Sequence, residues 1–119
     1  MNYKEAIDWL YSFEKHGIKL GLDRIKHICE KLGNPQSNYK IVHVGGTNGK
    51  GSVCKFISSI LASEGYTVGV YTSPHIQRFS ERFVIDKDEI SQIEIILLVE
   101  ELKPIVDEMI QKADIPTFF

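Results

Sequence analysis

The chain is poor in several features that would assign a protein to a particular class. Its 119 residues include two cysteines, Cys29 and Cys54, and neither has the spacing of a CxxC or Cys/His metal site. We expect both to be small buried residues on helices, in a protein of the reducing cytoplasm. The formal net charge of −2 provides no basic field that would attract nucleic acid or an anionic membrane. The composition therefore argues against both partners.

Long hydrophobic runs are also missing. The longest apolar stretch, around Ile93 to Val99, is interrupted by Glu94 and Glu100, so no segment is expected to cross a bilayer. The first residues, Met1 to Glu5, lack the charged and then apolar pattern of a signal peptide. What remains is an ordinary globular composition, 43% hydrophobic and 25% charged, which predicts one folded core.

Two helices are predicted near the N-terminus. Asn2 and Glu5 have the spacing of a capping box, and the apolar side chains that follow recur at helical spacing until Gly17. After a glycine-bounded connector, residues 25–32 form one apolar face, and the glycine and proline that follow should end this second helix.

The next part of the chain predicts an α/β fold. Residues 39–44 are a β-branched run typical of a buried strand, residues 50–64 have helical spacing, and residues 67–71 resemble a second buried strand. Such a βαβ unit has parallel strands and a right-handed crossover. We therefore predict an N-terminal helical segment over residues 1–38, and over residues 39–119 the start of a P-loop-type domain with a parallel sheet and flanking helices.

In the C-terminal part, the sequence patterns that predict helices and strands are less regular. Residues 83–90 could form a small hairpin, and Ser91 with Glu94 resembles a second capping box that opens a long helix. Pro104 should kink or divide that helix. Residues 115–119 are apolar and strand-like, so the domain is expected to continue beyond them, and a fragment with an unpaired sheet edge should be poorly soluble.

The clearest chemical signal is the glycine-rich junction between the first strand and the helix that follows it. In such a turn, successive backbone N–H groups surround phosphate oxygens, and the helix adds the positive end of its dipole. Lys50 could then reach the β and γ phosphates. The usual P-loop pattern requires glycine where Val44 stands and a hydroxyl where Gly51 stands, so Ser52 offers its hydroxyl one residue late. Dinucleotide binding is less favoured because no GxGxxG occurs.

Several motifs together resemble one enzyme family. They are Leu20 to Arg24, the run Val44 to Ser52, the run Gly65 to His75 that contains TSPH, and the pair Glu81-Arg82. In this order and spacing they resemble folylpolyglutamate synthase/dihydrofolate synthase, within the Mur ligase superfamily. Gly51 favours this family over the muramyl peptide ligases. The resemblance covers nearly all of the chain but about a quarter to a third of a typical member, which implies an N-terminal fragment.

The resemblance implies an ATP-dependent ligase. With ATP and Mg²⁺, such an enzyme phosphorylates a carboxylate of folate or dihydropteroate, and the amine of L-glutamate then attacks the acyl phosphate. A free carboxylate is a poor electrophile, and magnesium with Lys50 would offset the charge that develops on the transferred phosphoryl group. A monomer is expected at full length.

The resemblance also implies roles for individual residues. Lys50 would be catalytic, and Ser73 and Ser52 would bind magnesium. The nucleotide would be bound by Thr47, Asn48, Gly49, Lys50, Gly51 and Ser52. The substrate would be bound by Gly17, Ile18, Lys19, Leu20, His75, Arg82, Thr117, Phe118 and Phe119. The family's other magnesium ligands, its modified lysine and its glutamate-positioning domain would follow Phe119, so catalysis by these residues alone is in doubt.

Other interpretations stay open at this point. His75 has no metal-ligand neighbours in sequence, so a structural role competes with ligand contact. Arg78, Glu81 and Arg82 could meet carboxylates of the substrate or pair with one another. The chain could also be a nucleotide-binding module without catalysis, or a P-loop ligase or phosphotransferase that acts on another carboxylate.

Overall fold

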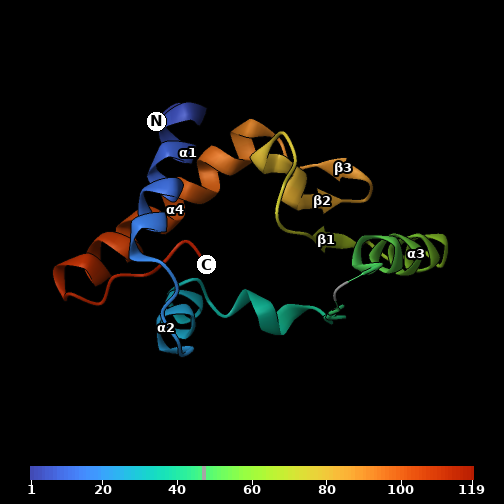
Figure 1. Cartoon of the computed structure of the whole chain (residues 1–119), viewed down its shortest axis with the longest axis horizontal. Coiled ribbons are helices and arrows are strands. Elements are labelled where there is room, and N and C mark those ends of the chain that lie inside the picture. The colour runs from blue at the N-terminus through green and yellow to red at the C-terminus, as the bar shows by residue number, and fades with distance from the viewer. Residues whose placement is uncertain (47) are drawn as a thin grey trace. The chain divides into compact units, whose positions relative to one another are not determined.

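The computed structural model describes residues 1–46 and 48–119, which form two compact units (Figure 1). The first unit combines Met1–Lys40 with Ile93–Phe119, and the second comprises Ile41–Gln92. Residues from both ends of the chain thus share one unit. The domain boundary predicted after residue 38 stays a prediction. The compact units are defined by contacts within the structure, and they place residues 93–119 with the N-terminal segment.

The first unit begins with helix α1, Tyr3–Tyr11, which continues as a 3-10 turn over Ser12–His16. The predicted capping box is confirmed: Asn2 Oδ1 accepts the backbone N–H of Glu5 at 2.8 Å, and Glu5 Oε2 accepts the backbone N–H of Asn2 at 2.9 Å. Gly17 follows with φ of 64°, a left-handed conformation that glycine adopts without a steric cost. The helical segment made of α1 and this 3-10 turn therefore starts and stops where its sequence signals predict.

Two further helices complete this unit. Helix α2, Asp23–Lys31, is followed by the 3-10 turn Pro35–Asn38, and helix α4 runs over Gln92–Gln111. Pro104 lies inside α4, which is assigned as one helix, so the predicted division at Pro104 does not occur. The buried hydrophobic core of the described residues lies in this unit; its members are Ala6, Phe13, Ile95, Val99, Val106 and Met109.

The second unit contains helix α3, Lys50–Ser63, and a small sheet made of β1, Gly69–Tyr71, β2, Phe83–Ile85, and β3, Asp88–Glu89. The strand order is β1-β2-β3. Both pairs are antiparallel, with Val70 opposite Val84 and Val84 opposite Glu89. The predicted hairpin is confirmed, and its turn is formed by Asp86 and Lys87, whose φ angles are 48° and 75°.

The described strands correct the prediction of a parallel sheet. Residues 39–44 form no strand in the structure, and Ile41 and Val42 are 67% and 63% exposed. A β-branched run becomes a strand only where a neighbour satisfies its N–H and C=O groups, and no described strand pairs with this run. Residues 115–119 are likewise without strand assignment.

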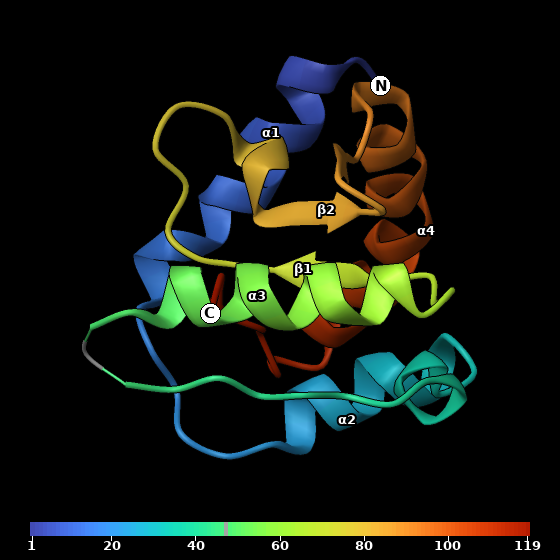
Figure 2. The same ribbon diagram turned by 90° about the vertical axis from the view of Figure 1, so that its right-hand side faces the viewer.

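Within the second unit, α3 contacts β1. The two elements run in opposite directions, so the loop that leaves β1 starts from the end of the unit at which α3 begins (Figure 2). This arrangement places two of the predicted site segments at one end of the unit. Among the described residues, no helix combines the length and the apolar character needed to span a membrane.

Candidate functional site

The N-terminus of α3 has the geometry of an anion-binding site. Gly49 is the N-cap with φ of 75°, and the N–H of Val53 donates to its carbonyl at 3.0 Å. The N–H groups of Lys50, Gly51 and Ser52 precede this bond and so have no carbonyl of the helix to meet. None of the side chains that the structure describes makes a capping hydrogen bond here. These N–H groups and the positive end of the helix dipole favour a phosphate oxygen.

The glycine loop before α3 is open to the approach of a ligand. Gly46 and Gly49 have φ of 133° and 75°, and a Cβ at either position would meet no atom within 4 Å. Asn48 and Lys50 are exposed. Thr47, the remaining predicted member of the loop, lies outside the described residues.

The predicted magnesium ligand Ser73 is an exposed residue in the loop that leaves β1. Among the described residues there is no cluster of three or more His, Cys, Asp or Glu that could hold a metal ion. Magnesium commonly keeps several waters and takes only one or two protein ligands together with phosphate oxygens. The hydroxyls of Ser73 and Ser52 fit an ion that arrives with a nucleotide, and they do not form a metal site by themselves.

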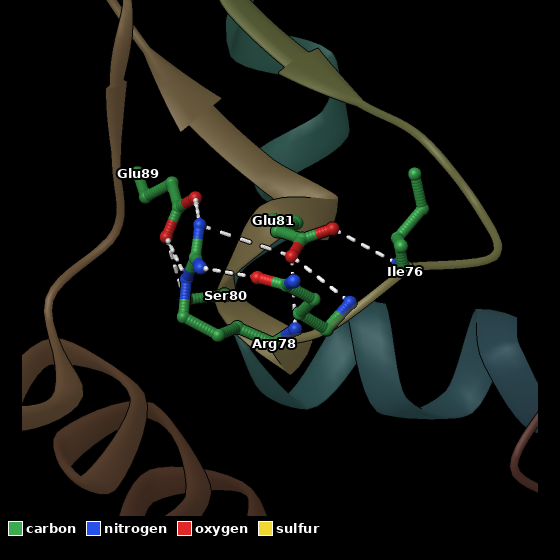
Figure 3. A network of polar contacts seen from close by, with 6 residues as sticks. Ile76, Arg78, Ser80, Glu81 and Glu89 are labelled. Atoms are coloured by element: carbon green, nitrogen blue, oxygen red, sulfur yellow. Dashed lines mark hydrogen bonds and ion pairs between the residues drawn. The ribbon is translucent and has the colours of Figure 1, made fainter.

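The loop after Ser73 is held by the carboxylate of Glu81 (Figure 3). Its Oε1 accepts the N–H of Ile76 at 2.9 Å, and its Oε2 accepts those of Gln77 at 3.1 Å and Arg78 at 2.9 Å. These backbone hydrogen bonds, led by that from Ile76, lower the pKa of Glu81 because they stabilise the charged form. The carboxylate is thereby committed to the loop backbone.

A second carboxylate attaches this region to the sheet. Glu89, on β3, accepts Arg78 Nη2 at 2.6 Å and Arg78 Nε at 3.2 Å, so the pair is bidentate. It also accepts the hydroxyl of Ser80, a buried residue, at 2.9 Å. The hydrogen bonds from Arg78 and then Ser80 lower the pKa of Glu89. Arg78 Nη2 also lies 3.8 Å from Glu81 Oε2, so these two residues pair with each other as one of the two interpretations predicts, although the shorter contacts of Arg78 are to Glu89.

Two of the predicted substrate residues, His75 and Arg82, are in direct contact. Arg82 donates its Nε–H to His75 Nδ1 at 2.8 Å. The guanidinium carbon of Arg82 lies 5.6 Å from the centre of the Phe79 ring, and the His75 ring lies 6.0 Å from it at 77°. Because Nδ1 accepts a hydrogen bond, a neutral His75 carries its proton on Nε2.

The other predicted substrate residues lie in the first unit, and there the structure brings the two ends of the chain together. Lys19 Nζ donates to the carbonyl of Ile115 at 2.9 Å. The rings of Tyr11 and Phe118 are stacked, with centres 5.2 Å apart and planes at 20°. Lys19 in the connector Gly17–Leu20 and Tyr11 on α1 therefore both contact the C-terminal segment that ends in Thr117–Phe119, although 96 positions separate Lys19 from Ile115.

This part of the first unit has an apolar and open surface. Ile18 and Leu20 in the connector are 73% and 94% exposed, and Phe119 is 80% exposed. Arg24 Nη1 on α2 lies 3.9 Å from Asp114 Oδ1, so the helix that follows the connector also contacts the chain next to Ile115. Exposed apolar side chains on two linked segments can contact a flat aromatic ring.

Sequence reasoning missed the roles of Glu81 and Glu89 as hydrogen-bond acceptors for the loop. For Glu81 a signal was present, because a glutamate three residues after the start of a helical turn is the acceptor half of a capping box, here with Arg78 at the N-cap. For Glu89 the partners lie on another element, so no local pattern could have identified it.

Comparison with known proteins gives one consistent result. No family model matches the chain. The dihydrofolate synthase/folylpolyglutamate synthase of Bacillus subtilis is 43% identical over 109 residues, which is 92% of this chain and 25% of the relative. The solved folylpolyglutamate synthetase of Lactobacillus casei superposes with a TM-score of 0.90 at 38% identity over 100% of this chain and 30% of that one.

A further solved structure, a complex of folylpolyglutamate synthase with AMPPCP and folate, has a TM-score of 0.85 at 37% identity and covers 98% of this chain and 29% of its own. The chain thus spans about a quarter of the length of the curated relatives it matches. Over the residues it comprises, this chain belongs to the folylpolyglutamate synthase/dihydrofolate synthase family.

Proposed function

We propose that these residues form the nucleotide-binding part of an ATP-dependent ligase that adds L-glutamate to folate or dihydropteroate. The observation that carries the proposal is the N-terminus of α3 at the glycine loop, which no described side chain caps, in a chain 43% identical to the Bacillus subtilis synthase. A solved relative bound to AMPPCP, an analogue of ATP, and to folate supports the choice of both ligands.

In this proposal the N–H groups of Asn48, Gly49, Gly51 and Ser52, together with Thr47, bind the triphosphate, and Lys50 neutralises the transferred phosphoryl group. The hydroxyls of Ser52 and Ser73 would hold magnesium, which would supply further charge neutralisation. The chain's own contribution is to orient the phosphates and to stabilise the charge that builds up on them. The substrate carboxylate would then attack the γ-phosphoryl group and release ADP, which gives an acyl phosphate. The amine of glutamate would attack this acyl phosphate, lose a proton and release inorganic phosphate as the amide forms.

The substrate residues fall into two groups in this proposal. The connector Gly17–Leu20 and the segment Thr117–Phe119, linked by Lys19 and by the Tyr11–Phe118 stack, would contact the ring system of the substrate. His75 and Arg82 would contact polar groups of the substrate as one hydrogen-bonded pair. A cation and an imidazole N–H are both suited to a carboxylate or a carbonyl oxygen.

The test is the variant Lys50→Ala in the complete native polypeptide, with Lys55→Ala as the matched control. Both lysines are exposed and lie on α3, but only Lys50 lies in its first turn. We expect Lys50→Ala to lower the turnover of glutamate addition by about 10²-fold or more, the magnitude typical of a lost transition-state contact. Turnover at the wild-type rate would rule out the role of Lys50. Product analysis with pteroate, folate and muramyl precursors identifies the acceptor.

A nucleotide-binding module without catalysis is the second candidate, and the N-terminus of α3 fits it equally, because that site accounts for phosphate binding and for no later step. Calorimetric titration with Mg-ATP, combined with an assay for glutamate addition, separates the two. Binding without addition supports the module, and addition supports the ligase.

A further inference from the structure

The loop from Thr72 to Arg82 is closed twice. At its base, the N–H of Thr72 donates to the carbonyl of Arg82 at 3.0 Å. Further along, the carboxylate of Glu81 accepts the three successive N–H groups of residues 76–78. Ser73 lies between these two fixed points, one residue after the first and three residues before the second. Residues 81 and 82 thus hold the loop backbone on both sides of Ser73.

The position of Glu81 is itself fixed by the sheet. Glu81 belongs to the 3-10 turn Phe79–Arg82, and the neighbouring Ser80 donates its hydroxyl to Glu89 on β3. Arg78 adds two hydrogen bonds to the same carboxylate. The loop backbone is therefore linked through Glu81 to a turn that is attached to β3 (Figure 3).

We propose that Glu81 is a positioning residue, whose carboxylate sets the backbone of residues 76–78 and thereby the location of the Ser73 hydroxyl. The proposal deepens the proposed function, on which it rests for the role of Ser73. Glu81 acts without touching the nucleotide or the substrate. Its effect is expected on the step that depends on Ser73, because a misplacement of about 1 Å at a reacting group can cost about 10²-fold in rate.

The experiment compares Glu81→Gln with Glu64→Gln in the complete native polypeptide. Glutamine keeps the length of the side chain but replaces a charged acceptor oxygen with an NH₂ group, which cannot accept an N–H. Glu64 is exposed, lies in the same unit at the C-cap of α3, and loses the same charge. The readouts are turnover, the Mg²⁺ concentration at half-maximal rate, the KM for folate, and amide hydrogen exchange over residues 76–78.

For Glu81→Gln we expect a turnover about tenfold lower or more, a rise of similar size in the half-saturating Mg²⁺ concentration, little change in the KM for folate, and faster exchange of these amides. A residue that only stabilised the fold would leave the Mg²⁺ requirement unchanged. Equal turnover and equal Mg²⁺ requirement in the two variants would overturn the proposal.

The wild-type protein provides a second test that does not depend on how the variant folds. Its amides at residues 76–78 should exchange more slowly than exposed loop amides, and unprotected exchange there would also overturn the proposal. Failure of the proposed function is recognised separately, because wild-type protein would then add no glutamate at all while the exchange result would still stand.

Discussion

Arg82 donates its Nε–H to Nδ1 of His75 at 2.8 Å, and this bond joins the TSPH segment to the glutamate-arginine pair seven residues later. The guanidinium also lies over the ring of Phe79, 5.6 Å from its centre. Imidazole and guanidinium therefore hold each other in place. The binding of a ligand that contacts one of these side chains therefore depends on the position of the other.

The two residues are predicted to act as one unit in catalysis. We expect Arg82→Lys and His75→Ala each to lower kcat/KM for folate by about tenfold, because either change removes the hydrogen bond from Arg82 Nε–H to His75 Nδ1. The double variant should then lose little more than each single variant. Steady-state kinetics with folate as the varied substrate measures this. Losses that multiply to about a hundredfold would show that the residues act independently.

A second prediction concerns pH. The pKa values of Glu81 and Glu89 lie below the ordinary value of 4.5, because hydrogen bonds to their carboxylates favour the charged form. Their contribution to stability is therefore fully present above pH 4.5 and is lost as the pH falls through their lowered pKa values. The measurement is the midpoint of thermal unfolding between pH 3 and 7 for the wild type and for the double variant Glu81→Gln, Glu89→Gln. At neutral pH the wild type should have the higher midpoint.

That difference should shrink below pH 4.5, where the wild-type carboxylates also become protonated. Glu64→Gln, which lacks these hydrogen bonds, provides the control for the loss of a charge. A difference between wild type and double variant that stayed constant from pH 7 to pH 3 would contradict the prediction.

The N-terminal capping box gives a third prediction. Asn2→Ala removes the acceptor for the backbone N–H of Glu5 and should lower the free energy of unfolding by about 1 kcal/mol. Lys4→Ala breaks an exposed ion pair with Asp8 in the same helix and should change stability little. Chemical denaturation of the three proteins measures both effects. An equal loss in the two variants would mean that the cap contributes no more than a surface pair.

The same capping box illustrates what the sequence could predict. Asn2, Gly17 and Gly33 are local signals, since each acts on backbone groups within a few residues of itself, and the helix ends they predict are the ones observed. The hairpin turn at Asp86 and Lys87 is local in the same sense. Elements of this kind were predicted from single windows of the chain.

The strand predicted over residues 39–44 shows where such reasoning stops. Ile41 and Val42 have the side chains of a buried strand, but a strand also needs a neighbouring strand to pair with. The residues of one short segment do not specify which strand that is. The contacts of the candidate site are similarly remote. Lys19 and the Ile115 carbonyl are 96 positions apart, so a resemblance could name both segments but could not predict the bond.

The last prediction uses that bond. If Lys19 acts by holding the C-terminal segment, Lys19→Met should release residues 115–119 and raise the KM for folate severalfold while leaving the KM for ATP unchanged. Lys15→Met is the control, since Lys15 is an exposed lysine on the preceding turn. Substrate kinetics on the complete native polypeptide measures both constants.

A second variant separates this role of Lys19 from direct contact with the substrate. Tyr11→Leu removes the stack on Phe118, so it should loosen the same segment and raise the KM for folate in the same way. Two changes that release one segment should not multiply, and the double variant should resemble the stronger single variant. If Tyr11→Leu leaves the KM unchanged while Lys19→Met raises it, the lysine contacts the substrate itself, and the link to Ile115 is incidental.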